Sequence, residues 1–413
     1  MLSSVFPRDH ARFHALPLLG GVLDGLCEWL GSKGYPRSGL RRRVTAAPHL
    51  ERLLCEAGVQ RLSDLTVSEL LLFAPSPTRW TPLITASLVR SLAHYLSERG
   101  QLALRPPTPA DRRVADYQRY LRDVRGLAPS SVEEQGAWVG QLLQFLAYDK
   151  DPTKLADLQV ADLQAFLVTL SGRRGRAGMQ KVTAALRGFV RFLCARGEAV
   201  PGLDEQIDTP RVHRDERLPR SLSWEVVGSL LSSIDQSTVK GLRDYAMLLL
   251  VATYGLRRGE IPPLTLDHVD WRARTIRVDR PKLGSPILLP LTDEVATALV
   301  NYLRHGRPES SSRSLFLKVR APAGPITRNV VGEAFDGWAR RAGIRLPPRA
   351  GGPHCLRHSL AEHLLRQGAT LKAIGDVLGH RSPESTGVYL RLQVEDLREA
   401  ALPLPTPGQE ERP

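Results

Sequence analysis

Two segments in the first half of the chain repeat one another, and this internal repeat constrains the fold more than any other feature of the sequence. Residues 62–70 match residues 155–163, and residues 88–100 match residues 186–197, at offsets of 93 and 97 residues. In both copies apolar residues recur at intervals of three and four, which is the spacing of amphipathic helices. Two matches in the same order predict a duplicated module, with each copy folded as a small helical bundle.

Proline-rich segments divide the chain into parts. Residues 105–110 have the sequence Arg-Pro-Pro-Thr-Pro-Ala, and because prolines cannot continue a helix this segment is expected to be an extended connector. Residues 201–222 carry three prolines and mixed charge without apolar periodicity, as expected of a linker. The predicted parts are a first helical module at 1–105, a second at 106–200, the linker at 201–222, a C-terminal domain at 223–400 and a flexible tail at 401–413.

The C-terminal domain is predicted to be helical with one small β element. Residues 275–278 and 287–290 are short runs that flank a turn, a pattern typical of a β-hairpin. Helical periodicity precedes and follows this hairpin. The predicted fold class is therefore mainly α with a small antiparallel β-sheet, an α+β fold.

The chain carries a large excess of positive charge. Its 413 residues include 57 Lys and Arg against 43 Asp and Glu, which gives a formal net charge of +14. Such an excess favours a polyanionic partner, and nucleic acid fits better than a membrane because no long basic amphipathic helix or lipidation motif is present. The longest apolar stretch, residues 245–256, is shorter than the ~20 residues of a membrane span, so no membrane partner is expected.

The cysteines and the first residues indicate the compartment. The four cysteines are scattered without metal-binding or redox spacing, and a chain of this size does not need disulfides, so a reducing cytoplasm is predicted. Pro7, Asp9 and His10 stand where a secretory signal would need an unbroken apolar run, so export is not expected.

A row of arginines recurs at every third residue of the linker, namely Arg211, Arg214, Arg217 and Arg220. In an extended chain this row could follow the phosphate backbone of DNA. The acidic residues between them equally allow a solvated linker in which the charges cancel. Both interpretations stay open from the sequence.

Three polar residues share one face at the start of a predicted helix. His354, Arg357 and His358 stand at positions i, i+3 and i+4, and the start of a helix attracts anions, so this face is suited to holding a phosphate. Cys355, His358 and His363 suggest a metal site only weakly, because they lack the HExxH glutamate and a recognisable ligand spacing. No metal is therefore predicted.

Five short motifs follow one another through the C-terminal half of the chain. They are Gly255-Leu-Arg257-Arg-Gly-Glu260, Lys282 in the predicted hairpin, His354-Cys-Leu-Arg357-His358-Ser359, Leu378-Gly-His380-Arg-Ser382 and Ser385-Thr-Gly-Val-Tyr389. In this order the chain resembles the tyrosine recombinases of the phage-integrase family, over about residues 111–397. The resemblance implies a helical core-DNA-binding domain of SAM-like fold at 106–200 and a tyrosine-recombinase catalytic domain at 223–400.

The implied chemistry needs these residue types. A tyrosine phenolate keeps the broken phosphodiester as a protein ester without metal or ATP, and the resemblance identifies Tyr389 as this nucleophile. The charge that develops on the phosphate must be met by fixed donors, for which guanidinium groups are well suited. By resemblance Arg257 and Arg357 fill this role, with His380 as a further donor.

The resemblance also assigns the proton transfers. His354 assists removal of the proton from the tyrosine, and Lys282 protonates the 5′-oxygen that leaves. Glu260 orients the first arginine, while His358 is either a second supporting residue or an ordinary packed histidine of the helix. No cofactor is implied.

The chain departs from the family pattern in one region. Gly259 stands where a hydroxyl residue is common, and Pro262 and Pro263 interrupt the helix that usually continues after the glutamate. These differences predict an altered backbone around Arg257 but remove no catalytic group.

The resemblance implies a site-specific DNA recombinase of the integrase or transposase type, and the sequence leaves its role open among integration, transposition and resolution. It would cut and rejoin double-stranded DNA through a 3′-phosphotyrosyl intermediate and a Holliday junction. The implied partners are two DNA recombination sites, the other subunits of a homotetramer on DNA, and accessory DNA-bending proteins. Without DNA a monomer or dimer is expected, and the protein would work at the bacterial nucleoid.

Two other functions stay open. A type IB topoisomerase would use the same chemistry to relax DNA as a monomer. A non-catalytic DNA-binding or synapsis protein is the alternative of a different class, and the presence of all six catalytic residue types argues against it. The module at 1–105 lies outside the minimal family plan, so it either contacts additional DNA or binds other subunits.

Overall fold

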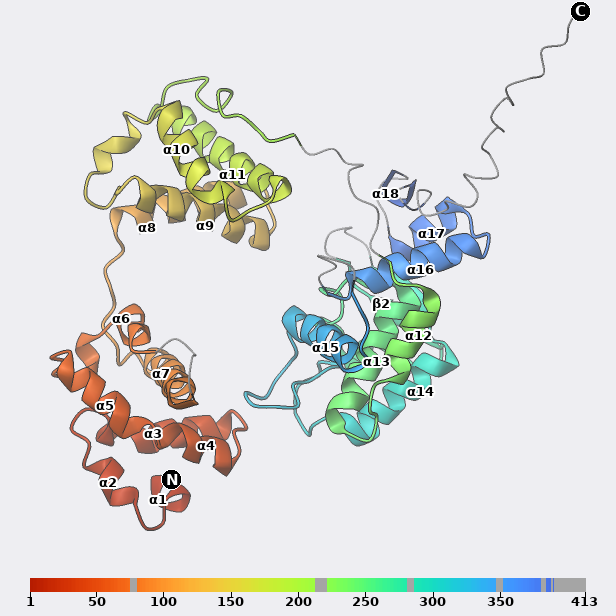
Figure 1. The fold of residues 1–413 in the computed structure, drawn as a ribbon, viewed down its shortest axis with the longest axis horizontal. Helices are drawn as coiled ribbons and strands as arrows, with labels where there is room; N and C mark the ends of the chain where they lie inside the picture. Colours follow the sequence, from red (N-terminus) through yellow and green to blue (C-terminus); the bar gives the residue numbers. More distant parts are fainter. Residues whose placement is uncertain are drawn as a thin grey trace, which may run out of the picture. The chain divides into compact units, whose positions relative to one another are not determined.

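The structure is a computed structural model, and it describes residues 1–74, 80–211, 221–280, 286–346, 352–379, 384–387 and 389 (Figure 1). The chain divides into two compact units, one made of Met1–Leu102 with Leu218–Pro413 and the other of Ala103–Arg217. Most of the buried apolar side chains that the structure describes form four clusters, within residues 2–102, 117–207, 222–356 and 360–389. None of the described helices is both long enough and apolar enough to cross a membrane.

The predicted fold class is confirmed, because the described residues are mostly helical with one small antiparallel sheet. The strands, in sheet order, are β1 (Val269–Asp270), β2 (Thr275–Val278) and β3 (Ile287–Pro290). β2 and β3 are the predicted hairpin, paired so that Ile276 lies opposite Leu289. The sequence did not predict β1, since a strand of two residues is too short to show alternation.

The first module, residues 1–102, is helical in its described part. Its elements are α1 (Leu2–Val5), α2 (His10–His14), α3 (Gly20–Ser32), α4 (Arg37–Val44), α5 (Ala47–Glu56), the 3₁₀ turn η1 (Leu62–Asp64), α6 (Val67–Leu72) and α7 (Trp80–Glu98). Thr66 and Glu69 begin α6 with a capping box, in which each side chain accepts a hydrogen bond from the other residue's backbone N–H. Leu88, Leu92 and Leu96 of α7 are buried in the core of this module.

The second module is also helical. Its elements are α8 (Pro109–Asp123), α9 (Pro129–Phe145), the 3₁₀ turn η2 (Pro152–Leu155), α10 (Val160–Ser171) and α11 (Arg176–Ala195). Thr108 and Asp111 form the capping box of α8, and Pro109 occupies its first turn, where a missing N–H costs nothing. The rings of Tyr117 and Phe189 meet edge to face in the core, with centroids 5.3 Å apart.

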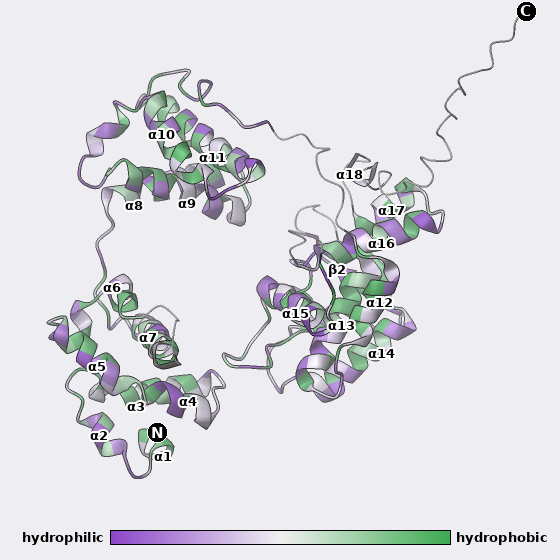
Figure 2. Ribbon diagram, in the orientation of Figure 1, coloured by the Kyte–Doolittle hydropathy of each residue, from purple (hydrophilic) through white to green (hydrophobic). Residues whose placement is uncertain are grey.

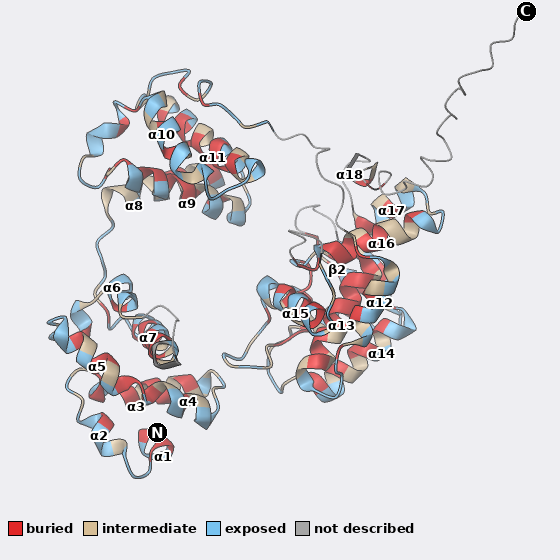
Figure 3. Cartoon of the chain, in the orientation of Figure 1, coloured by how far each residue is buried: buried red, intermediate tan, exposed pale blue. Residues whose placement is uncertain are grey.

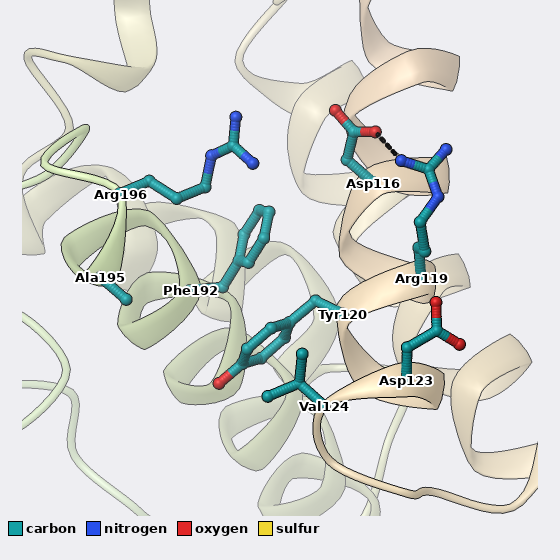
Figure 4. A pocket seen from close by; sticks show the side chains of 8 residues that line it. All are labelled: Asp116, Arg119, Tyr120, Asp123, Val124, Phe192, Ala195 and Arg196. Carbon is teal, nitrogen blue, oxygen red and sulfur yellow. Dashed lines mark hydrogen bonds and ion pairs between the residues drawn. The ribbon is translucent and has the colours of Figure 1, made fainter.

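A cavity of about 310 Å³ opens between α8 and the end of α11 (Figure 4). It is lined by Asp116, Arg119, Tyr120, Asp123, Val124, Phe192, Ala195 and Arg196. Arg119 donates a hydrogen bond to Asp116 at 3.2 Å, and the lining holds as many acids as arginines. The cavity therefore has no net charge with which to select a polyanion.

The C-terminal domain surrounds one buried helix. Its helical elements are α12 (Trp224–Ser232), α13 (Val239–Tyr254), the 3₁₀ turn η3 (Leu266–His268), α14 (Asp293–Asn301), the π turn η4 (Tyr302–Gly306), α15 (Arg328–Arg341), α16 (His354–Arg366), α17 (Leu371–Leu378) and α18 (Glu384–Gly387). α13 is apolar along most of its length (Figure 2), and it packs against α12, α14, α15 and α16. Most of its residues are buried (Figure 3), so it forms the centre of the domain.

A buried ionic cluster fixes α13 to α15. Asp244 is fully buried and accepts hydrogen bonds from Arg243 Nη2 at 2.7 Å and from Trp338 Nε1 at 2.9 Å, and it also pairs with Lys240. Arg243 is buried as well. Each charge is therefore compensated by its partner rather than by water.

Asp244→Ala is expected to destabilise the domain by about 3–5 kcal/mol, because it leaves the Arg243 guanidinium buried without its carboxylate. Urea unfolding followed by Trp fluorescence measures this change. Asp293→Ala removes an exposed carboxylate, 91% accessible and paired with Arg274, and is the matched control with an effect within about 0.5 kcal/mol. Equal unfolding curves for the two variants would contradict a stabilising role of the cluster.

Candidate active site

The structure brings together sequence-predicted residues from three separate parts of the C-terminal domain. Arg257 and Glu260 follow α13, Arg357 and His358 lie in the first turns of α16, and Tyr389 stands near the end of the described chain. Two other predicted residues, Lys282 and His380, lie outside the described residues. In the linker Arg211 is described and exposed, while Arg214, Arg217 and Arg220 lie outside the described residues.

Gly255 ends α13 and allows the site to close around it. Its φ of +61° is a left-handed conformation that favours glycine. A Cβ at this position would lie 2.5 Å from Cδ2 of Leu378 and 3.5 Å from Cγ of Arg357. Only glycine therefore lets α16 and α17 approach the end of α13 this closely.

Arg357 is buried at the centre of the site. Its Nη1 donates to the carbonyl of Gly255 at 2.6 Å and its Nη2 donates to the carbonyl of Leu378 at 2.5 Å. Burial, together with the nearby charge of Arg257, lowers the pKa of Arg357 to about 10. Because the partners in these two bonds are neutral, an anion that enters the site gains the attraction of a guanidinium that water does not reach.

Arg257 is held from two sides. Its Nη1 donates to Glu260 Oε1 at 2.9 Å, and its backbone N–H donates to Oε2 of the same carboxylate at 2.8 Å. Its Nη2 donates to the carbonyl of Gly379 at 3.1 Å. The Arg257 side chain is about 30% exposed, so it is fixed in place but still accessible to a ligand.

Arg280 is a buried arginine of this site that the sequence analysis did not identify. Its Nη2 donates to the carbonyl of Val377 at 3.2 Å, and its Nε lies 3.9 Å from Glu260 Oε1. Burial lowers its pKa. Ile276 and Val278 of β2 are buried on alternate positions, and continuing that alternation by two residues reaches Arg280, which was the signal available in the sequence.

The end of α17 collects all three arginines. Its consecutive carbonyls at Val377, Leu378 and Gly379 accept hydrogen bonds from Arg280, Arg357 and Arg257, in that order. The last carbonyls of a helix lack partners within the helix, and the helix dipole makes this end negative. Since a guanidinium carries five N–H donors, each arginine retains donors beyond those that fix it.

Arg280→Gln is expected to slow DNA strand cleavage by about 10–100-fold with little change in DNA affinity. The substitution removes the cation between Glu260 and the end of α17, so Arg257 and Arg357 are expected to shift from their positions. Arg277→Gln is the control, since Arg277 lies three residues earlier on β2, is 55% exposed and pairs with Asp279. Single-turnover cleavage and gel-shift affinity separate the two effects. Equal cleavage rates for both variants would rule out a positioning role for Arg280.

The hydroxyl of Tyr389 lies 2.9 Å from Nδ1 of His358. Tyr389 is 1% exposed, and burial raises its pKa even though Arg357 and Arg257 act in the opposite direction. The sequence left His358 open between a supporting role and simple packing, and its ring is now placed next to the tyrosine. A protonated phenol at neutral pH needs a proton acceptor before it can attack an electrophile.

His354 lies one helical turn before His358, and the two rings meet edge to face with centroids 4.6 Å apart. The side chain of His354 keeps a solvent-exposed edge. Packing around its ring, together with the charges of Arg357, Arg257 and Arg258, lowers the pKa of His354. The imidazole is therefore neutral at pH 7 and able to accept a proton.

Two family models match the chain, the phage integrase family over residues 220–396 and the phage integrase N-terminal SAM-like domain over residues 114–197. The integrase/recombinase y4rA of Sinorhizobium fredii is 33% identical over 388 residues, covering 92% of this chain and 93% of that protein. Tyrosine recombinase XerD of Lacticaseibacillus casei is 29% identical over 288 residues, covering 69% of this chain and 95% of XerD.

Solved structures share the fold at low sequence identity. The XerH site-specific recombinase, in a post-cleavage complex with its difH substrate, has a TM-score of 0.53 at 19% identity, covering 72% of this chain and 97% of XerH. A lambda integrase dimer bound to a core site has a TM-score of 0.53 at 16% identity, covering 67% of this chain and 94% of that one. From its sequence relatives and its fold, the chain belongs to the phage integrase family of tyrosine recombinases, which cut and rejoin DNA at specific sites.

Proposed function

We propose that Tyr389 cuts one DNA strand by direct attack of its phenol oxygen on the scissile phosphorus. The bond from phosphorus to the 5′-oxygen breaks, a 3′-phosphotyrosyl ester forms, and the 5′-hydroxyl is released. The ester retains the free energy of the phosphodiester, so the reverse reaction with a new 5′-hydroxyl rejoins the strands. The observation that carries this proposal is the buried Tyr389 hydroxyl beside His358, in a site where Arg357 and Arg257 are held in fixed positions.

The arginines stabilise the charge that develops on the phosphate. Arg357 and Arg257 donate to its non-bridging oxygens from positions that carbonyls and Glu260 fix before the substrate arrives. His380 is proposed as a third donor by family resemblance. Preorganised donors of this kind need no rearrangement as the reaction proceeds.

Two groups transfer the protons. His354, neutral at pH 7, takes the proton of Tyr389, and His358 orients the phenol through the 2.9 Å hydrogen bond. Lys282 is proposed, by family resemblance, as the acid that protonates the 5′-oxygen. The phosphate, the nucleophile and the leaving group are then each assigned to residues of the site.

The protein is proposed to act as a homotetramer on two double-stranded DNA sites, through a Holliday junction. The fold is similar to that of lambda integrase, of which a tetramer bound to a Holliday junction has been solved (TM-score 0.52, 16% identity). In this scheme residues 106–200 and 223–400 hold the DNA, and residues 201–222 join them. Accessory DNA-bending proteins, a monomer or dimer without DNA, and a cytoplasmic location at the nucleoid complete the proposal.

Covalent capture on nicked DNA tests the proposed function. A site is first selected by binding from a random DNA pool, and a nick near the cleavage point then lets the short fragment that carries the released 5′-hydroxyl diffuse away. The recombinase should form a covalent complex that survives denaturation and should join two intact sites in a plasmid. Relaxation of a plasmid without a site would instead indicate a topoisomerase, and binding without covalent capture would indicate a synapsis protein.

A further inference from the structure

The two helical modules share one element order, with turns at matching places. In the first module positive φ angles occur at Gly34, Gly58 and Gly100, and in the second they occur at Gly126, Ala147 and Gly197. Each of these residues follows a helix. After the second of them, each module has a 3₁₀ turn and then a helix that begins with a capping box, at Thr66 in the first module and at Gln159 in the second. α3, α4 with α5, α6 and α7 therefore correspond to α8, α9, α10 and α11.

The correspondence holds residue by residue where α4 matches α9. Counted from Gly34 and Gly126, the buried Leu40 falls on the buried Val132, and the buried Val44 falls on the buried Gly136. The three residues between them have the same burial in both modules, two exposed and one half-buried. Equal burial at equal offsets indicates that these surface positions face the same way within each module.

The charge at these positions is opposite in the two modules. The first module has Arg41, Arg42 and Arg43, where the second has Glu133, Glu134 and Gln135. α4 also begins with Arg37 and contains no acidic residue. The first module thus shares the helical framework but carries a basic surface at these positions, where the second carries acidic and neutral residues.

The basic surface continues onto α7. Arg42 and Arg43 line a cavity of about 250 Å³ together with Leu83, Ile84 and Ser87 of that helix. Arg90 is exposed three residues after Ser87 and therefore lies on the same side of α7.

Two arginines of this surface lie over aromatic rings, and the guanidinium of Arg41 is 5.4 Å from the centre of the Phe6 ring. Arg43 Nη1 donates to the carbonyl of Gly39 at 3.2 Å, and its guanidinium lies 4.2 Å from the centre of the Tyr35 ring. Arg37 and Arg42 form no ion pair with any described residue, and both are exposed.

We propose that the first module is a second DNA-binding module of the SAM-like type, and that α4 and the adjoining part of α7 bind the phosphate backbone of duplex DNA. The proposal rests on the assignment of the chain as a DNA recombinase, which supplies the polyanion. Uncompensated arginines on one helix, without acids among them, suit a row of phosphates better than a protein surface of mixed charge. These contacts position the duplex without selecting its sequence.

The salt dependence of DNA binding by the full chain tests this proposal. The variant Arg37→Gln/Arg41→Gln/Arg42→Gln removes three charges from α4. Binding to a mixed-sequence duplex should then show a slope of log K against log[salt] that is smaller by about 2–3, or about 0.9 for each phosphate that is no longer neutralised. The single variant Arg42→Gln should lower the slope by about 0.9.

The matched control is Arg52→Gln/Arg61→Gln/Arg99→Gln, which removes three exposed charges from the same module. Arg52 and Arg61 pair with acidic residues, and Arg99 lies over the ring of Tyr95. The control should keep the wild-type slope. DNA should also protect Arg41 and Arg42, but not Arg52 and Arg61, from modification by phenylglyoxal, as measured by mass spectrometry.

An unchanged slope in the folded α4 variant, checked by circular dichroism, would overturn the proposal. If the slope is unchanged and sedimentation shows that the variant assembles differently from the wild type, α4 would instead be assigned to a contact between protein subunits. Covalent capture on nicked DNA reports on the recombinase chemistry separately. If the α4 variant is captured like the wild type but its slope is unchanged, only the second DNA-binding module is rejected, whereas absence of capture with the wild type would count against the proposed function.

Discussion

Replacing Tyr389 with Phe is expected to abolish covalent attachment of the protein to DNA and to leave DNA affinity unchanged. Without the phenol oxygen no phosphotyrosyl ester can form. The Phe ring fills the same buried position, and the lost hydrogen bond to His358 costs about 1 kcal/mol, so the variant should fold. Denaturing gels of reactions with a nicked substrate measure capture, and gel shifts on intact DNA measure affinity.

Tyr245→Phe is the matched control for this variant. It removes a phenol hydroxyl from α13, where Tyr245 donates to Glu294 at 3.4 Å, and it should be captured as efficiently as the wild type. Capture of the Tyr389→Phe protein at the wild-type level would assign the nucleophile to another residue.

Much of the fold follows from local sequence patterns. The helical pattern before the hairpin and the short runs at 275–278 and 287–290 predicted α13 and the hairpin, because a helix buried on most sides leaves a long apolar stretch and a hairpin leaves two short runs around a turn. The motif residues around Arg257 and Arg357 could be chosen because five motifs follow one another in the order of the family, although each motif alone is weak. Their roles follow from the family resemblance and stay predictions.

The assembly of the site depends on contacts that no local pattern contains. The carbonyl that holds Arg257 belongs to Gly379, 122 residues further along the chain. Alternation along β2 reaches Arg280, but the carbonyl that binds it belongs to Val377, 97 residues further along the chain. The place of His358 next to Tyr389 likewise depends on where the chain returns after α17. All three contacts depend on tertiary packing, which is determined by the whole sequence rather than by a local pattern.

Arg357→Met is expected to lower the rate of strand cleavage by about 10²–10³-fold, because the phosphate loses a donor that was fixed before the substrate arrived. Arg357→Lys should restore little of this rate. An ammonium keeps the charge but cannot donate in the geometry that the Gly255 and Leu378 carbonyls impose on a planar guanidinium. Single-turnover cleavage at saturating protein measures the rate apart from DNA affinity.

Arg366→Met is the control, because Arg366 lies on the same helix, is 63% exposed and pairs with Glu362. A wild-type rate for Arg357→Lys would mean that charge alone suffices and that the carbonyl contacts do not matter for cleavage.

The burial of Arg357 also predicts how much bound DNA stabilises the protein. A guanidinium whose pKa burial lowers to about 10 is held at a cost until an anion compensates it, so bound DNA should raise the melting temperature of the wild type more than that of Arg357→Met. If DNA raised both melting temperatures equally, Arg357 would not be the group that the phosphate stabilises.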